Sequence, residues 1–183
     1  KSAVSGMVDP AAIEQTMANR PCIYKGFDSI CLGEMDEEAP LTLNREALDT
    51  ALIVSKLFGM VPVDKAYVMR KIIVDGSSPT GFQRTTFISG SGTLSTDSGA
   101  CGIATLSLEE DSATSLGSSD EYLSVSLDRL GIPLIEIATD PDIKTPEQAY
   151  EVASKIGMFL RSTGKVKRGL GTIRQDVNVS IRE

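Results

Sequence analysis

The sequence predicts an α+β domain, in which a largely antiparallel sheet has helices packed on one face. Seven segments of the chain are rich in Val, Ile, Thr or Tyr, the composition typical of strands. Few helical patterns separate these segments, and strands that follow one another without long crossovers are mostly antiparallel. The chain has 183 residues and 41% apolar content, which is enough to bury a core.

Three segments carry helix signals. Asp9 is a favourable N-cap residue, and Pro21 stops this first predicted helix near Arg20. The second helix is predicted from Asn44 to Phe58, where apolar residues recur at helical spacing.

The third helix is predicted to begin at Thr145, which forms a capping box with Gln148, and to end at Gly164. Residues 89–100 are rich in Ser and Gly and are predicted to form a mobile loop or a long hairpin tip. Strands are predicted at 22–34, 61–74, 82–89, 101–109, 121–128, 132–139 and 172–182.

Composition excludes several classes of protein. The net charge of −7 argues against broad electrostatic binding of nucleic acid, and the absence of histidine excludes a Ser-His-Asp or Cys-His mechanism within this chain. Three widely spaced cysteines without a CxxC motif argue against structural zinc and favour a reducing compartment. No apolar run approaches the roughly 18 residues of a membrane helix. We therefore expect a cytoplasmic protein without a membrane partner.

The most unusual acidic residue is Glu136, which stands within an apolar run, residues 131–138. A buried carboxylate is costly unless it is paired or bound to metal, so we expect Glu136 in a concave, acid-lined site. The alternative is a half-exposed strand on which Glu136 faces solvent. Further candidate acids are Glu109 and Glu110, at the end of one predicted strand, and Asp176 in another, although solvated strand positions would also explain them.

Basic residues gather in two places. Arg70 and Lys71 lie in a predicted strand. The glycines of segment 169–171 are surrounded by Lys165, Lys167, Arg168 and Arg174. Glycines let backbone amides approach phosphate, and cations neutralise it. Neither a Rossmann nor a P-loop motif is present. Three acidic sites and two basic patches together suggest chemistry that combines a metal ion with a nucleotide.

Longer motifs add a family resemblance. From about residue 41 onward, the chain resembles the E-type subunits of the archaeal glutamyl-tRNA(Gln) amidotransferases and, more loosely, their bacterial B-type counterparts. Ordered motifs of this length are far more specific than a three-residue pattern. They are MRKIIVDGS at 69–77, GFQRT at 81–85, LEED at 108–111, LDRLGIPLIEIA at 127–138 and TGKVKRGLGTIRQDVNVSIR at 163–182.

The resemblance implies a kinase-like "cradle" domain with the glutamine synthetase-like catalytic fold. In that family, the domain uses ATP and Mg²⁺ to phosphorylate the side chain of glutamate esterified to tRNA(Gln). Ammonia from an asparaginase-like partner subunit then displaces phosphate and leaves glutaminyl-tRNA(Gln). Phosphoryl transfer depends mainly on positioning and charge neutralisation, which agrees with the acids and bases identified above.

The resemblance also implies roles for single residues. Glu109 and Glu136 match metal-binding acids, and Asp176 matches an acid at a second metal or ammonia site. Glu136 and Asp176 are therefore the expected catalytic residues, while Glu110 is the alternative to Glu109 because adjacent acids leave the register ambiguous. The residues expected to bind ATP or line the acceptor pocket are Lys71, Gln83, Lys167, Arg168 and Arg174.

The chain also departs from the family. It lacks a Gly-Leu-Glu-x-His motif that supplies a further metal ligand, and it lacks the parts that grip tRNA. We therefore expect residues 1–183 to be part of a longer cradle domain, to receive charged tRNA(Gln) mainly through other domains, and to be inactive alone. Two alternatives stay open: a structural interaction domain that binds no nucleotide, and another ATP-dependent amide ligase of the glutamine synthetase fold.

Overall fold

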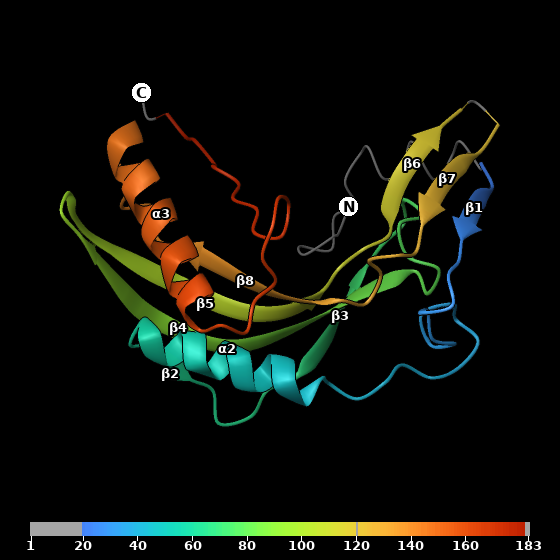
Figure 1. Cartoon of the computed structure of the whole chain (residues 1–183), viewed down its shortest axis with the longest axis horizontal. Coiled ribbons are helices and arrows are strands. Elements are labelled where there is room, and N and C mark those ends of the chain that lie inside the picture. Colours follow the sequence, from blue (N-terminus) through green and yellow to red (C-terminus); the bar gives the residue numbers. More distant parts are fainter. Residues whose placement is uncertain (1–19, 120, 182–183) are drawn as a thin grey trace.

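The computed structural model describes residues 20–119 and 121–181, and within these ranges the chain forms two sheets and two helices (Figure 1). The larger sheet has five strands in the order β2-β4-β5-β8, with β3 beside β4, and all of its pairings are antiparallel. Its strands are β2 (Val61–Pro62), β3 (Val68–Ile72), β4 (Phe82–Thr96), β5 (Gly99–Glu110) and β8 (Pro133–Thr139).

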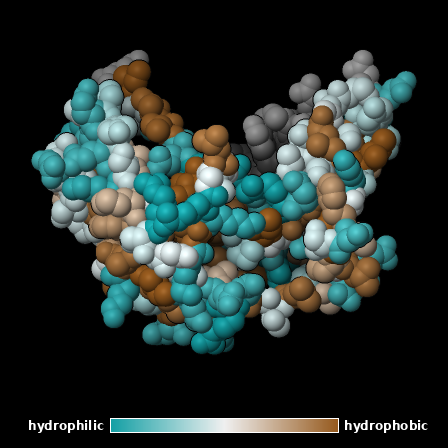
Figure 2. Space-filling view, in the orientation of Figure 1, coloured by the Kyte–Doolittle hydropathy of each residue, from teal (hydrophilic) through white to brown (hydrophobic). Residues whose placement is uncertain are grey.

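The smaller sheet has three strands, β1 (Cys22–Lys25), β7 (Leu123–Ser126) and β6 (Thr114–Ser118). β1 is parallel to β7, and β6 is antiparallel to it. In Figure 1 this sheet and helix α3 stand at opposite ends of the large sheet, and the space-filling surface in Figure 2 dips between them. The predicted α+β class with mostly antiparallel pairing is confirmed.

Two predicted helices fall within the described ranges and are confirmed: α2 (Arg45–Leu57) and α3 (Pro146–Ser162). The side chain of Asn44 caps α2 by accepting a hydrogen bond from the backbone N–H of Ala47 at 2.9 Å. Thr145 caps α3 by accepting one from the backbone N–H of Gln148 at 3.2 Å. The first predicted helix lies outside the described residues. Neither α2 nor α3 is long and apolar enough to cross a membrane.

Both helices pack against one face of the large sheet. The apolar stripes of α2 and α3 meet alternate residues of β4 and β5 in a single buried cluster, as the sequence predicted. Phe58, at the end of α2, and Phe159, on α3, contact each other with ring centroids 5.4 Å apart. The opposite face of β5 carries polar positions such as Thr105 and Ser107. The sheet therefore has one apolar face and one open polar face.

The β4–β5 hairpin decides between the two alternatives predicted for residues 89–100: the segment belongs to a long hairpin and is not a loop. Both strands continue through this segment, and only Asp97 and Ser98 form the tip. Gly92 shows why small residues occur here: a Cβ at this position would collide with the side chain of Met60, which follows α2. The small residues therefore allow close packing between the strand and the end of the helix.

Three strand predictions also need correction. Only the first four residues of segment 22–34 form a strand, and segment 61–74 divides into β2 and β3. Segment 172–182 forms no strand in the part of the chain that the structure describes, although Val177 and Val179 alternate with polar residues. Alternation predicts a strand only where a partner edge is available, and these valines are exposed. The prediction missed β6, which has little apolar content.

Glu151 joins α3 to the tip of the β4–β5 hairpin. Its carboxylate accepts hydrogen bonds from the hydroxyl and backbone N–H of Ser98 and from the backbone N–H of Asp97. Lys155 Nζ lies 3.6 Å from its Oε1. These interactions lower the pKa of Glu151 to about 2. The hydrogen bond from the Ser98 hydroxyl has the largest effect, and the backbone donors and the Lys155 ammonium add to it.

We expect Glu151→Gln to lower stability at neutral pH, because a carboxyl with a lowered pKa stabilises the fold when it is ionised. The stabilisation by ionised Glu151 is fully present at a pH above the ordinary glutamate pKa of 4.5. It is lost as the pH falls toward the pKa of about 2 in the folded state. The difference in unfolding free energy between parent and variant, measured in urea, should therefore disappear across that window. Glu37→Gln is the control and should follow the parent, whereas identical pH profiles for the two variants would contradict this role for Glu151.

Candidate functional site

Three adjacent strands bring polar side chains together at one end of the large sheet. In the register of β3, β4 and β5, Lys71 lies opposite Gln83, and Thr85 lies opposite Glu109. Lys71 Nζ lies 2.7 Å from Oε1 of Glu109, and the Thr85 hydroxyl donates to the same oxygen at 2.8 Å. The Glu109 side chain is 12% exposed. The structure thus makes neighbours of three residues that the sequence singled out.

Strand alternation separates Glu109 from Glu110, because successive side chains point to opposite faces. Glu109 lies with Lys71 on the open face. Glu110 lies on the face of Leu108, which is part of the core, and its carboxylate pairs with the guanidinium of Arg84. The two acids that the sequence left interchangeable therefore have different surroundings, and only Glu109 shares a face with Lys71.

Glu136 lies in the middle of β8, opposite Ser107 of β5. Residues that face each other in an antiparallel pair share a sheet face, so Glu136 and Glu109 lie on the same open face of neighbouring strands. Glu136 is exposed and lines neither of the two cavities described below. The expectation of a concave environment is wrong, and the exposure agrees with the alternative of a solvent-facing strand position, although one further acid, Glu109, shares its face.

Asp111 anchors the end of β5 and is 8% exposed. Its Oδ2 accepts a hydrogen bond from Nε of Arg129 at 2.8 Å, and its Oδ1 accepts one from the backbone N–H of Ser112 at 3.0 Å. The guanidinium of Arg174 lies 3.7 Å from Oδ1. Asp111 therefore links the end of the sheet to the C-terminal segment. The prediction missed this role because three consecutive acids resemble a solvated strand end.

A cavity of about 530 Å³ opens beside this end of the sheet. Its volume lies within the range of small-molecule and cofactor sites. One wall comes from the segment before α2, including Leu41 and Leu43. The predicted residues that line it are Gln83, Glu109 and Glu110, and Asp111 lies beside them.

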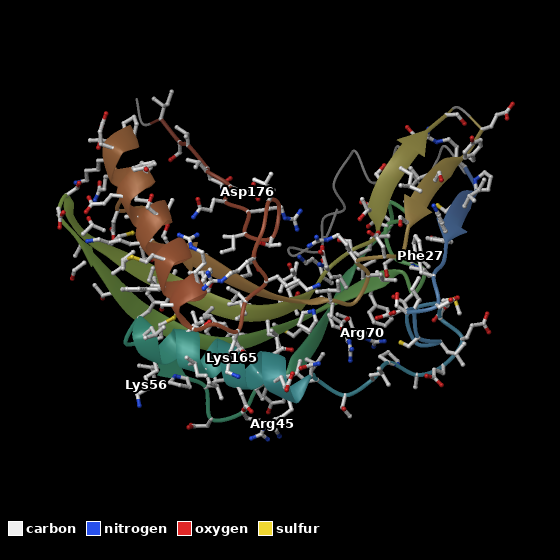
Figure 3. All side chains as sticks on the ribbon, viewed as in Figure 1. Phe27, Arg45, Lys56, Arg70, Lys165 and Asp176 are labelled. Atoms are coloured by element: carbon white, nitrogen blue, oxygen red, sulfur yellow. The ribbon has the colours of Figure 1, made fainter. Side chains whose placement is uncertain are left out.

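Of the predicted basic residues in the C-terminal segment, Lys167 and Arg168 line a different cavity, whereas Arg174 contacts Asp111 of the larger cavity. Lys167, Arg168 and Arg161 line a space of about 260 Å³ that shares no lining residue with the larger cavity. Asp176 is exposed on an extended segment that pairs with no strand of the described ranges (Figure 3). The polar strand face predicted around Asp176 is therefore not formed in this structure.

Comparison with known families identifies the domain that holds these residues. Residues 24–183 match the GatB/GatE catalytic domain. The chain belongs to this family. The match covers every site residue named above, so the GatB/GatE catalytic domain contains the polar sheet end and both cavities.

Three relatives are named as the E-type subunit of glutamyl-tRNA(Gln) amidotransferase. The chain is 60% identical to the Methanosarcina barkeri protein and 54% identical to the Archaeoglobus fulgidus protein, in each case over 178 residues. It is 50% identical to the Methanococcus maripaludis protein over 179 residues. Each comparison covers 97% of this chain but only 28–29% of the relative, so the chain spans less than a third of their length.

The four acids predicted to bind metal form no ready cluster. Within the described ranges, no group of three or more metal-binding side chains is arranged to hold an ion. Mg²⁺, however, often uses only one or two protein carboxylates and completes its shell with water and phosphate oxygens. In this GatB/GatE catalytic domain, Glu109 and Glu136 share a face on neighbouring strands, and this pair fits that donor set.

The sequence prediction also missed Thr85, Arg84 and Arg129. Thr85 could have been found, because strand alternation within the GFQRT motif places it on the same face as Gln83. Arg84 and Arg129 carry no comparable signal. Their acidic partners lie 26 and 18 residues away in sequence, and only the sheet register and the turn before β8 bring them together.

Proposed function

We propose that this domain activates the glutamate side chain of Glu-tRNA(Gln) with ATP and Mg²⁺, as part of a glutamyl-tRNA(Gln) amidotransferase with a glutamine synthetase-like catalytic fold. The observation that carries the proposal is the 50–60% identity to the E-type amidotransferase proteins over nearly the whole chain. The polar sheet end supports it, because two carboxylates and an ammonium on one face suit phosphoryl transfer.

The proposed reaction has two steps. One oxygen of the glutamate side-chain carboxylate attacks the γ-phosphorus of ATP, and ADP leaves. Ammonia then attacks the activated carbonyl carbon, inorganic phosphate leaves with the original carboxylate oxygen, and the nitrogen loses a proton. Both steps move negative charge between oxygen atoms, so the protein contributes mainly by positioning reactants and neutralising charge.

One oxygen of the Glu109 carboxylate is available to bind a cation. Lys71 and Thr85 both bind its Oε1, which leaves Oε2 without a hydrogen-bond partner among the described residues. Glu109 and Glu136 would hold Mg²⁺, which when bound supplies neutralisation of the phosphate oxygens. Lys71 adds a positive charge on the same face. Gln83 donates from its side-chain amide to the carbonyl of Glu110 and keeps the end of β5 in place.

Other parts of the enzyme would supply the remaining functions. A net charge of −7 suits a domain that holds little of the tRNA by itself, so tRNA(Gln) would be bound mainly by other domains. Ammonia would come from an asparaginase-like partner subunit. Asp176, which is exposed in this structure, would act beside the ammonia.

The test follows one oxygen atom. Glu-tRNA(Gln) labelled with ¹⁸O in the side-chain carboxylate is incubated with the assembled amidotransferase, ATP, Mg²⁺ and ammonium. We expect the inorganic phosphate to gain one ¹⁸O for each glutaminyl-tRNA formed. Unlabelled phosphate alongside product would contradict activation by phosphorylation. Equal use of free glutamate would favour another amide ligase, and the absence of ATP consumption would favour an interaction domain.

Nucleotide binding gives a second prediction, which uses the 183-residue chain. ATP with Mg²⁺ at 100 times its dissociation constant should raise the free energy of unfolding by about 2.7 kcal/mol, because only the folded state binds it. Lys71→Met should reduce this gain, since the ammonium on the polar face is lost. Lys56→Met, on the exposed side of α2, is the control and should keep it. No stabilisation of the parent chain would contradict nucleotide binding.

A further inference from the structure

The carboxylate of Glu109 is held through one of its two oxygens. Lys71 Nζ, on β3, lies 2.7 Å from Oε1, and the Thr85 hydroxyl, on β4, donates a hydrogen bond to the same oxygen at 2.8 Å. Oε2 has no hydrogen-bond partner among the residues that the structure describes. The direction in which the free oxygen points therefore depends on the two donors that hold Oε1.

Thr85 is the more rigid of the two donors. It lies in β4, opposite Glu109 of β5 on one side and opposite Met69 of β3 on the other. Its side chain is half-buried, and a β-branched side chain has few χ1 rotamers. Lys71 lies in β3, which pairs with β4 alone among the described strands, and its ammonium stands on a long flexible stem. The geometry of the carboxylate therefore depends mainly on Thr85.

The two donors also differ in charge. The ammonium of Lys71 is positive, so it repels a cation at the second oxygen of the carboxylate, and a phosphate ligand attracts it away from Glu109. The Thr85 hydroxyl is neutral, so it does not repel the cation and is attracted less strongly to phosphate. Thr85 is therefore the donor suited to hold Oε1 both before and after a nucleotide binds.

We propose that Thr85 is a positioning residue of the ion site, whose hydroxyl fixes Glu109 so that the second carboxylate oxygen binds the cation. This inference rests on the proposed function, in which Glu109 and Glu136 hold Mg²⁺. Groups that orient metal ligands through hydrogen bonds change metal affinity about 10–100-fold when they are removed. Thr85 fits this role, because within the described residues its hydroxyl binds only the carboxylate of Glu109.

The test measures the affinity of Mn²⁺, which replaces Mg²⁺ and gives an EPR signal for the free ion. The protein is the assembled amidotransferase without nucleotide, and the relevant ion is the one that Glu109→Gln releases. Thr85→Val keeps the shape and the β-branching of the side chain but removes the hydroxyl, and it should weaken binding of this ion about tenfold. Thr85→Ser keeps the hydroxyl and should recover most of the parent affinity.

Two further variants separate positioning from a general disturbance of the sheet. Lys71→Met removes the neighbouring ammonium and should strengthen Mn²⁺ binding about threefold, because like charges a few ångströms apart repel each other even in a water-like medium. Thr105→Val is the matched control. It removes an exposed hydroxyl from the same face of β5 and should leave the affinity unchanged.

Activity gives an independent measurement. In glutaminyl-tRNA formation, Thr85→Val should raise the Mg²⁺ concentration for the half-maximal rate about tenfold, while the rate at saturating Mg²⁺ stays near that of the parent. A hydroxyl with a merely structural role would lower the urea midpoint of unfolding and leave the Mg²⁺ dependence unchanged.

Several outcomes would overturn the role of Thr85. They are a parent-like Mn²⁺ affinity in Thr85→Val, an equal loss in Thr85→Ser or Thr105→Val, and weaker binding in Lys71→Met, which would make the ammonium the positioning group. In each of these cases the proposed function still stands, because Glu109→Gln releases the ion. If Glu109→Gln instead keeps every Mn²⁺ ion of the parent, the ion site of the proposed function is wrong, and the role of Thr85 fails with it.

Discussion

Replacing Glu136 by glutamine is expected to lower glutaminyl-tRNA formation by the assembled amidotransferase by about one hundred to one thousand fold. A loss of this size is typical when one preorganised group that stabilises transition-state charge is removed. The unfolding free energy should change by less than about 0.5 kcal/mol, because Glu136 is exposed and no residue of the described ranges pairs with it. Activity loss without a stability change would distinguish a ligand position from a structural one.

Activity measurements on variants of Glu109 and Glu110 test whether Glu136 and Glu109 hold the same ion. Glu109→Gln should cost as much activity as Glu136→Gln, and the double variant should cost little more than either, because both acids would hold one ion. Glu110→Gln should affect activity far less, since this carboxylate lies on the helix-covered face with Arg84. Glu136→Gln with activity within about threefold of the parent would mean that Glu136 is only a solvated strand position.

Local signals predicted the helices well, because their ends depend on nearby residues. Asn44 and Thr145 cap their helices through backbone N–H groups only three residues away, which a sequence pattern can show. Local composition allowed either a mobile loop or a hairpin tip at residues 89–100, and it did not predict that β4 and β5 continue through most of this segment. Its Ser and Gly residues are strand positions because the end of α2 approaches Gly92, and this contact depends on packing over many residues.

The sequence predicted which residues form the candidate site, but not which face of the sheet each of them occupies. Lys71, Gln83 and Glu109 are neighbours, as proposed from the motifs that contain them. Which of two adjacent acids belongs to the polar face depends on the register between β4 and β5, and no single-sequence pattern fixes that register. Asp176 was misplaced for a related reason, because its strand-like alternation finds no partner among the described strands.

The second large effect is expected at Asp111. Asp111→Asn keeps the volume of the side chain but removes the charge that accepts the hydrogen bond from Arg129 at 2.8 Å. Hydrogen bonds to charged groups contribute about 1.5–3 kcal/mol, and a partner left unsatisfied adds to the loss. We therefore expect the unfolding free energy to fall by about 2 kcal/mol, and the melting temperature by about 4–8 °C for a domain of this size.

Two matched variants test whether the effect of Asp111→Asn comes from this buried position. Arg174→Gln should cost less than about 1 kcal/mol, because its side chain is 66% exposed and lies 3.7 Å from the carboxylate. Asp49→Asn removes an exposed carboxylate that pairs with Arg45 within α2, and it should cost about 0.3–0.5 kcal/mol. Urea unfolding of the three variants gives the comparison. A loss at Asp111 no larger than at Asp49 would mean that Arg129 finds another acceptor and that Asp111 does not anchor the end of the sheet.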